Sequence, residues 1–281
     1  MIVNDGSTDG VASIISKLSQ TYNNIKVVEQ SNQGLSEARN NGFKVANGKY
    51  IWFIDSDDTI TINCLGTLVN LLERHNLDVL TVGPSIPFIE NFPEHYDEKR
   101  ELSAIYNGID FVVRSQKFVV GAWCYIFKRS FWESNKLNFY KGITYEDTQL
   151  MAYALSLAKK VASLTSFSCY NYVQREGSIM NSKPNKHKLM SLAVIVNTHT
   201  QYAEEANNAD LKKTFKKSAS GAFISGLKHI ILMDGSARFL YNEYSAAITK
   251  HPKYVYGKSF LHRLFQFFVL HFPYLYIKLL K

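Results

Sequence analysis

The chain has 281 residues, of which 46% are hydrophobic, 14% aromatic and 20% charged, a composition that supports one or two folded domains and excludes an intrinsically disordered protein. Its net charge of +8 is placed unevenly. Residues 1–175 carry 17 Lys and Arg against 18 Asp and Glu, whereas residues 176–281 carry 15 against 6, so the basic excess describes a surface in the C-terminal third.

The first part of the chain alternates short apolar runs with helical patterns. Strands are predicted at "MIVN", "IKVVEQ", "YIWFI" and "LDVLTVG", and helices between them at "STDGVASIISKLSQTY", at "GLSEARNNGFKVANG" and over residues 63–76. Strands that alternate with helices of this length predict an α/β fold with a mostly parallel sheet flanked by helices.

The pattern changes further along the chain. Residues 84–102 contain three prolines and predict an irregular insertion. "VVGAWCYIFKRSFW" then predicts a strand that turns into a short helix, "TYEDTQLMAYALSLAKK" a helix, and "FSCYNYVQREGSIM" a strand that leads to a loop. From about residue 185 helical periodicity dominates to the end of the chain.

Acidic residues follow two of the predicted strands. Asp5 lies in "VNDGSTDG", and Asp55 and Asp57 lie in "FIDSDD". Because ligands bind beyond the carboxyl ends of parallel strands, these positions predict a site, and carboxylates two residues apart suit Mn²⁺ or Mg²⁺. The alternative is a pair of ordinary turns, in which an acid caps the next helix and Gly6 supplies a positive φ.

Two further candidates lie on predicted helices. Glu146 and Asp147 stand side by side at the start of a helix, where acids complement the helix dipole and where one of them could act as a general base. Arg39 is by itself a surface residue or an ion-pair partner.

Five stretches in register resemble family 2 glycosyltransferases of the GT-A fold. They are "VNDGSTDG", "NQGLSEARNNGFKVANGKYIWFIDSDD", "AWCYIFKRSF", "YEDTQL" and "YNYVQREGSIM", and the likeness, which covers residues 1 to about 180, extends to bacterial members that build capsule, O-antigen or exopolysaccharide. The resemblance implies a nucleoside-diphosphate sugar donor, most simply a UDP-sugar, and a glycan or lipid-linked acceptor. It implies an inverting, metal-dependent transfer of a single sugar.

The resemblance also implies a role for each matched residue. Asp5 would contact the nucleobase or ribose, with Arg39 near the base and Asp55 near the ribose. Asp57, with Asp55, would hold the divalent ion at the diphosphate. Asp147 would be the catalytic base, with Glu146 beside it.

Three departures from the family pattern accompany this likeness. Family members normally open with a strand and helix before the "VNDGS" strand, and this chain has neither. No histidine stands near "YNYVQREGS", and the "QxxRW" signature of processive synthases is absent. The missing strand and helix keep a truncated, non-catalytic remnant or binding protein as the alternative, whereas the missing "QxxRW" favours the addition of a single sugar. A nucleotidyltransferase would need a Gly-rich basic loop near the N-terminus, which the sequence lacks.

The expected domains are a catalytic region, 1–180, and a basic helical region, 181–281, with a candidate membrane-surface helix at 258–281. Pro273 is predicted to kink or end that helix. A face shared by Leu261, Leu264, Phe265, Phe268 and Phe272, with basic residues around it, either docks on the protein's own core or lies on an anionic membrane surface.

No groove-binding motif accompanies the basic residues, so nucleic acid is not expected as a partner. The sequence predicts no signal peptide and no transmembrane helix. Three widely spaced cysteines predict no disulfide framework or metal spacing. The expected location is the cytoplasm, with peripheral attachment to the inner face of the cell membrane.

Overall fold

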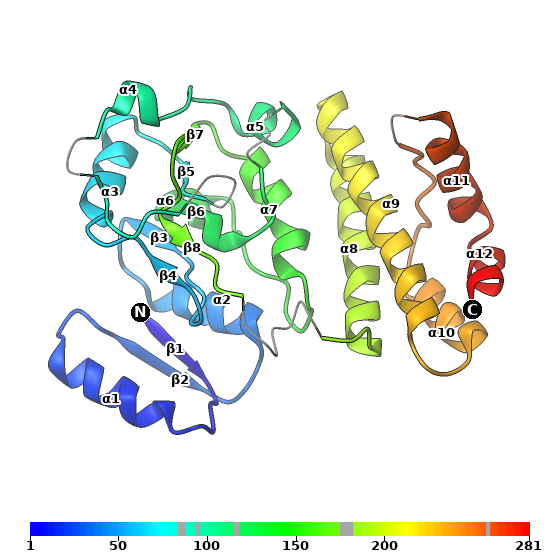
Figure 1. Ribbon diagram of the computed structural model, residues 1–281, viewed down its shortest axis with the longest axis horizontal. Helices are drawn as coiled ribbons and strands as arrows, with labels where there is room; N and C mark the ends of the chain where they lie inside the picture. Colours follow the sequence, from blue (N-terminus) through cyan, green and yellow to red (C-terminus); the bar gives the residue numbers. More distant parts are fainter. Residues whose placement is uncertain (84–87, 94–95, 115–117, 175–181, 257–258) are drawn as a thin grey trace. The chain divides into compact units, whose positions relative to one another are not determined.

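The computed structural model describes residues 1–83, 88–93, 96–114, 118–174, 182–256 and 259–281 (Figure 1). The chain divides into two compact units, a sheet unit of residues 1–142 and 150–173 and a helical unit of residues 143–149 and 174–281. The predicted α/β fold followed by a helical C-terminal region is confirmed. Within the described ranges, no helix combines the length and the apolar character needed to cross a membrane.

The sheet unit follows the predicted alternation of strands and helices. Its strands are β1 (Ile2–Asp5), β2 (Val27–Gln30), β3 (Tyr50–Trp52), β4 (Thr59–Ile60), β5 (Val79–Thr81), β6 (Tyr125–Lys128), β7 (Val161–Ser163) and β8 (Tyr170–Asn171). Its helices are α1 (Val11–Thr21), α2 (Leu35–Val45), α3 (Leu65–Arg74), α4 (Glu98–Glu101), α5 (Gly108–Arg114), the short η1 (Ala122–Cys124) and α6 (Arg129–Ser134). Helix α7 (Glu146–Ser156) begins in the helical unit and continues into the sheet unit.

Strand pairing is mixed rather than mostly parallel as predicted. β1 pairs with β2 and β5 with β7 in parallel, but β6 runs antiparallel to both of its neighbours in the order β3-β6-β5-β7, and β4 pairs antiparallel with β8. A helical crossover between consecutive strands favours parallel pairing. β6 is instead reached from β5 through a long connection that carries α4 and α5, and it enters the sheet from the opposite end.

The core of the sheet unit lies on both faces of the four-stranded sheet. On one face, Leu68, Leu71 and Leu72 of α3 pack against Leu80 of β5, with the i, i+3, i+4 spacing of an amphipathic helix. Elsewhere in the unit an aromatic group forms the packing. Phe53, Phe127, Trp132 and Phe139 have ring centroids 4.9–5.6 Å apart along their contacts.

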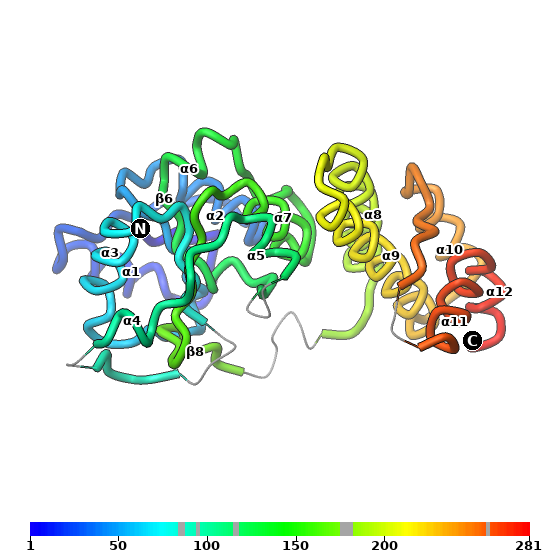
Figure 2. Tube along the Cα trace, turned by 90° about the horizontal axis from the view of Figure 1, so that it is seen from above, coloured from blue at the N-terminus to red at the C-terminus, as the bar shows by residue number. Residues whose placement is uncertain are grey.

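The helical unit consists of α8 (Lys186–Glu205), α9 (Ala209–Leu232), α10 (Ala237–Ala246), α11 (Phe260–His271) and α12 (Pro273–Leu280). α8 and α9 lie side by side, as both views show (Figures 1 and 2). The Asn208 side chain caps α9 by accepting from the N–H groups of Asp210 and Leu211. The predicted break at Pro273 is confirmed, because α11 ends and α12 begins there. Residue 258, where the candidate membrane-surface helix is predicted to begin, lies outside the described residues.

Candidate active site

Asp5 ends β1 and fixes the loop that follows β2. Its Oδ1 accepts hydrogen bonds from the Gln30 side chain and from the backbone N–H of Gln33, both at 2.7 Å, and its Oδ2 accepts one from the N–H of Gly34 at 2.8 Å. The parallel pairing of β1 with β2 brings the two carboxyl ends to one edge. A carboxylate offers about four acceptor positions, so Asp5 keeps capacity for one further donor.

Gly6 lets the loops after β1 and β2 approach each other. Its φ is 73°, and a Cβ added there would lie 2.8 Å from the backbone nitrogen of Asn32. Both features disfavour any other residue at this position. The turn is also closed by Asn4, whose Oδ1 accepts a hydrogen bond from the N–H of Ser7 at 3.0 Å. The turn chemistry expected of "VNDGS" is therefore present together with an anchored carboxylate.

Arg39 connects α2 to the end of β3. Its Nη2 lies 2.7 Å from Oδ1 of Asp55, and its side chain is only 7% exposed. The guanidinium carbon stands 5.1 Å from the ring centroid of Phe139. The neighbouring Asn40 exchanges two hydrogen bonds of 2.9 Å with the backbone of Phe139. Arg39 is thus an ion-pair partner held by packing rather than a surface residue.

The acidic turn after β3 is held by Tyr170, which is not among the site residues predicted from the sequence. The Tyr170 hydroxyl donates to Oδ2 of Asp58 at 2.5 Å and accepts from the N–H of Asp55 at 3.1 Å, while the N–H of Val173 donates to Oδ1 of Asp58 at 2.8 Å. Burial raises the pKa of Asp58 above its usual range, and the bond from Tyr170 opposes that rise. Burial and the neighbouring Asp58 raise the pKa of Tyr170.

Tyr170 also belongs to a stack of aromatic rings. Trp123 stacks on Tyr170 with a centroid distance of 4.5 Å and on Tyr172 with one of 5.5 Å. The indole N–H of Trp52 donates to the backbone oxygen of Trp123 at 2.8 Å, which ties β3 to this stack. The only signal for it in the sequence is the spacing of Tyr170 and Tyr172, which places both on one face of a strand.

Asp57 lies half-buried in the turn that joins Asp55 to Asp58. Among the described residues, no group of three or more His, Cys, Asp or Glu side chains is arranged to hold a metal ion. Mg²⁺ is typically bound through one or two carboxylates with water and substrate phosphates in the other positions. The carboxylates of Asp57 and Asp55 form a donor set of the kind that fits such an ion, and Arg39 contacts Asp55 at Oδ1.

Glu146 and Asp147 occupy the first turn of α7, in the helical unit. Tyr145, which precedes them, has a φ of 69°, a left-handed conformation that costs a non-glycine residue about 1–2 kcal/mol. Packing of Tyr145 against the core of the helical unit holds it there. Glu146 is 7% exposed and Asp147 is half-buried. The structure thus confirms that the two acids begin a helix.

A buried polar network fixes this turn within the helical unit. His199 of α8 lies with Nε2 3.1 Å from the backbone oxygen of Gln149 and Nδ1 2.7 Å from the Ser218 hydroxyl of α9. Because a carbonyl oxygen only accepts, Nε2 carries the proton and Nδ1 accepts from Ser218. Burial lowers the pKa of His199 to about 4, so the ring is neutral at pH 7. No motif in the sequence indicates this network.

Comparison with known proteins gives a consistent family signal. Residues 1–134 match the family model described as Glycosyl transferase family 2. The uncharacterized glycosyltransferase YibD of Escherichia coli is 25% identical over 219 residues, which are 73% of this chain and 63% of that protein. Glycosyltransferase GlyA of Streptococcus pneumoniae is 29% identical over 242 residues, 81% of this chain and 34% of that protein. The chain therefore spans between about a third and just under two thirds of the length of these relatives.

A solved structure shares the fold. Residues 1–349 of TarS from S. aureus, crystallised in complex with UDP-GlcNAc, align with a TM-score of 0.56 over 98% of this chain and 82% of that chain, at 18% identity. The same protein in complex with UDP gives a TM-score of 0.55 at 16% identity. At this identity the likeness establishes the architecture.

Proposed function

Because residues 1–134 match the model of glycosyltransferase family 2, we propose that the chain belongs to this family and transfers a single sugar from a nucleoside-diphosphate sugar to an acceptor hydroxyl. The observation that carries the proposal is the fixed Arg39–Asp55 pair at the end of β3, in the same unit as the anchored Asp5. A UDP-sugar is the proposed donor, supported by the UDP-GlcNAc bound to the structurally similar TarS.

We assign nucleotide recognition to Asp5, Arg39 and Asp55. Asp5 retains acceptor capacity after its three hydrogen bonds, which suits an N–H donor of a nucleobase or a ribose hydroxyl. Arg39 is held by Asp55 and by Phe139, so its guanidinium loses little side-chain entropy when a base or ribose binds beside it. Asp55 would contact the ribose or the ion.

Asp57, with Asp55, is the proposed site for Mn²⁺ or Mg²⁺. Bound there, the ion would neutralise negative charge on the diphosphate as it leaves. The chain's own contribution is the turn that carries these carboxylates, which Tyr170 and Val173 hold through Asp58. A rigid turn limits the freedom of the donor atoms.

Asp147 is the proposed general base, with Glu146 beside it. The carboxylate would take the proton from the acceptor hydroxyl while the hydroxyl oxygen bonds to the anomeric carbon. The bond from that carbon to the diphosphate breaks in the same step, and its electron pair leaves with the diphosphate. One in-line displacement inverts the anomeric centre. The assignment rests on the motif and on the place of both acids in the first turn of α7.

The proposed acceptor is a glycan or a lipid-linked hydroxyl at the inner face of the cell membrane. The support is compositional, since residues 176–281 carry 15 Lys and Arg against 6 Asp and Glu. A surface of that charge is attracted to anionic lipid headgroups.

Calorimetric titration of the chain with UDP, with and without Mn²⁺, tests donor binding. We expect Mn²⁺-dependent binding that Asp57→Asn removes. Asp97→Asn is the matched control, because Asp97 is an exposed acid that caps α4 and asparagine caps a helix equally well. Equal binding by both variants would contradict the metal role of Asp57. Absence of UDP binding under either condition would overturn the donor assignment.

A second variant separates binding from transfer. Asp147→Asn is expected to bind UDP and Mn²⁺ with unchanged affinity and to release product from a UDP-sugar and acceptor at a rate at least about a hundred-fold lower. Transfer at the original rate would place the base elsewhere.

A further inference from the structure

We propose that the outer face of α11, formed by Phe260, Leu261, Leu264 and Phe265, binds the surface of an anionic lipid bilayer together with basic residues of α11 and α12. The purpose of such binding, access to a lipid-linked acceptor, rests on the proposed function. The surface itself is a property of the helical unit alone.

α11 and α12 are fixed to the protein through their inner sides. Gln266, Val269 and Leu270 of α11 are buried, and Val269 and Leu270 join the core that contains Phe223 of α9. At the end of α12, the Lys281 amino group donates to the backbone oxygens of Ile230 and Met233 at 3.1 and 2.7 Å. This docking is one of the two alternatives left open by the sequence, and it uses only one side of α11.

The other side of α11 is equally apolar and is exposed. Phe260 and Leu261 are 78% and 75% exposed, and Leu264 and Phe265 are 54% and 47% exposed. At ~100° per residue these four side chains fall within an arc of about 140°, opposite the arc of the buried residues. A helix that is apolar on both sides is normally buried on both sides. The outer face is therefore a largely exposed apolar surface, with a ring contact from Phe265 to Tyr276 of α12.

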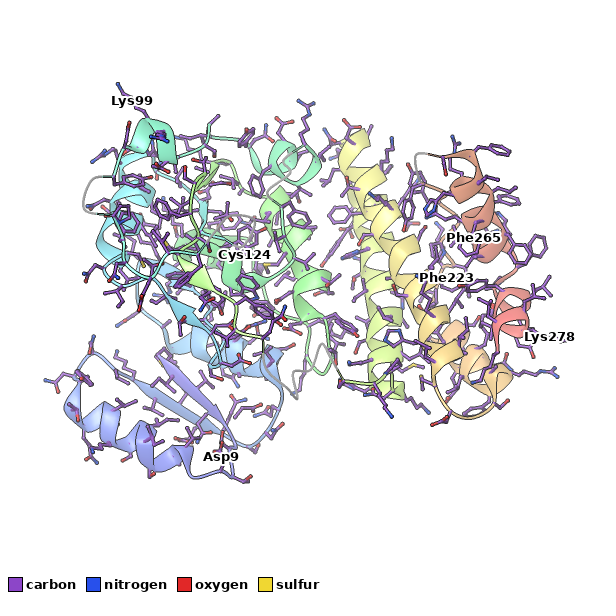
Figure 3. All side chains as sticks on the ribbon, viewed as in Figure 1. Asp9, Lys99, Cys124, Phe223, Phe265 and Lys278 are labelled. Atoms are coloured by element: carbon purple, nitrogen blue, oxygen red, sulfur yellow. The ribbon has the colours of Figure 1, made fainter. Side chains whose placement is uncertain are left out.

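Phe268, which the sequence places on the same face, is half-buried and packs against the core, and Phe272 is exposed. Figure 3 shows Phe265 on α11 and Lys278 on α12, with Phe223 on α9. Phe265 contacts Tyr276 of α12 edge to face at 5.8 Å, which joins the two helices beside the outer face.

Charge identifies the partner as an anionic surface rather than a second copy of the chain. After Glu243 the sequence contains six Lys and Arg and no Asp or Glu. Arg263 lies on α11 and Lys278 on α12, and both are exposed. Two such faces brought together would repel each other, whereas anionic headgroups would attract both residues while lipid tails receive the aromatic and leucine side chains. α11 has 12 residues and is about 18 Å long, shorter than the ~30 Å hydrocarbon core, so it would lie in the interface.

Sedimentation with vesicles tests the proposal on the full chain without any sugar donor. Vesicles of about 30% phosphatidylglycerol in phosphatidylcholine are expected to bind the protein, and pure phosphatidylcholine vesicles to bind it at least about five-fold less. The double variant Phe260→Ser, Leu261→Ser is expected to lose about ten-fold or more in partitioning. Ile14→Ser, at a 59% exposed position of α1, is the matched control and is expected to bind as the original chain does.

A charge variant distinguishes binding to anionic lipid from nonspecific hydrophobic adsorption. The double variant Arg263→Gln, Lys278→Gln is expected to bind anionic vesicles more weakly than the original chain. Its vesicle binding should also fall less than that of the original chain when about 0.5 M salt is added. Equal vesicle binding by the Phe260→Ser, Leu261→Ser variant and the original chain would overturn the proposal. The proposal would also be overturned if the original chain were a dimer and the Phe260→Ser, Leu261→Ser variant a monomer. A second copy of the chain would then occupy the outer face.

The proposed function can fail without affecting this test. Asp57→Asn, which is expected to lose Mn²⁺-dependent UDP binding, is expected to keep vesicle binding. The Phe260→Ser, Leu261→Ser variant is expected to keep UDP binding and to lose vesicle binding. Loss of vesicle binding alone in the Phe260→Ser, Leu261→Ser variant supports the proposal. Loss of both UDP binding and vesicle binding in one variant would indicate a folding defect, which circular dichroism of that variant would reveal.

Discussion

Removing the hydroxyl of Tyr170 is expected to destabilise the turn that carries the candidate metal ligands. Tyr170→Phe keeps a ring that is 1% exposed and stacked on Trp123 at 4.5 Å, so packing is preserved. It removes the donor to Asp58 at 2.5 Å and the acceptor for the N–H of Asp55. The change therefore isolates two hydrogen bonds.

The magnitude follows from the kind of bond. A hydrogen bond to a charged group contributes about 1.5–3 kcal/mol, and part of that is lost to solvent screening at the partly exposed Asp58. A loss of about 2 kcal/mol in the free energy of unfolding is expected, or roughly 4–8 °C in melting temperature for a unit of this size.

The loss should depend on pH in a known direction. The bond from Tyr170 lowers the pKa of Asp58 against the raising effect of burial, so the bond favours the ionised carboxylate. The destabilisation by Tyr170→Phe is therefore largest where Asp58 is ionised, and it shrinks as the pH falls and Asp58 becomes protonated.

Urea unfolding followed by circular dichroism measures the effect, with Tyr172→Phe as the matched control. Tyr172 stacks on the same Trp123, is 42% exposed, and its hydroxyl bonds to no described residue. The control is expected to unfold at the original urea midpoint. Equal urea midpoints for Tyr170→Phe and Tyr172→Phe would refute the stabilising role of the Tyr170 hydroxyl.

Three further predictions concern the helices. Arg39→Ala is expected to weaken UDP binding at least about ten-fold, measured by calorimetry, and to lower the free energy of unfolding by about 2–3 kcal/mol, measured by urea unfolding. Unchanged UDP affinity would show that Arg39 is not part of the nucleotide site. The free energy of unfolding should fall by roughly 3 kcal/mol between about pH 6.5 and pH 4, because His199 takes up its proton at a higher pH in the unfolded chain than in the folded one. Urea unfolding at several pH values measures this, and the contribution should be missing in His199→Gln. Gly108→Ala is expected to prevent stable folding, since its Cβ would overlap the carbonyl oxygen of Leu155, whereas Gly66→Ala in open space on α3 should raise the melting temperature by stabilising the helix by about 0.5–1 kcal/mol.

Local patterns in the sequence were enough to predict most of the regular elements. β1, β2, β3, β5 and β6 are apolar runs bounded by turn residues, and α11 ends where Pro273 lacks a hydrogen-bond donor. β4 and β7, of two and three residues, were not predicted, because they exist through pairing with β8 and β5 rather than through any local signal. The antiparallel direction of β6 depends on its long connection and was missed for the same reason.

In the candidate site, too, some residues could be predicted from local sequence and others could not. Carboxylates at strand ends and the Arg39 position follow from the motifs that contain them. Tyr170 reaches Asp58 across 112 positions of sequence, and His199 reaches Gln149 across 50, so no local pattern reports either contact. The carboxylates of a site are visible in the sequence, whereas the groups that hold them depend on the fold.

The separate pairing of β1 with β2 has a consequence for how the sheet unit moves. Among the described strands these two pair only with each other, so no backbone ladder joins them to the four-stranded sheet. Side chains of α2 contribute to the connection, through Arg39 to Asp55, Asn40 to Phe139 and Glu37 to Lys141. A segment without backbone pairing to the main sheet is expected to open as a local unit. A nucleotide held between Asp5 and Arg39 would close that opening and would slow amide hydrogen exchange in β1 and β2 far more than in β5.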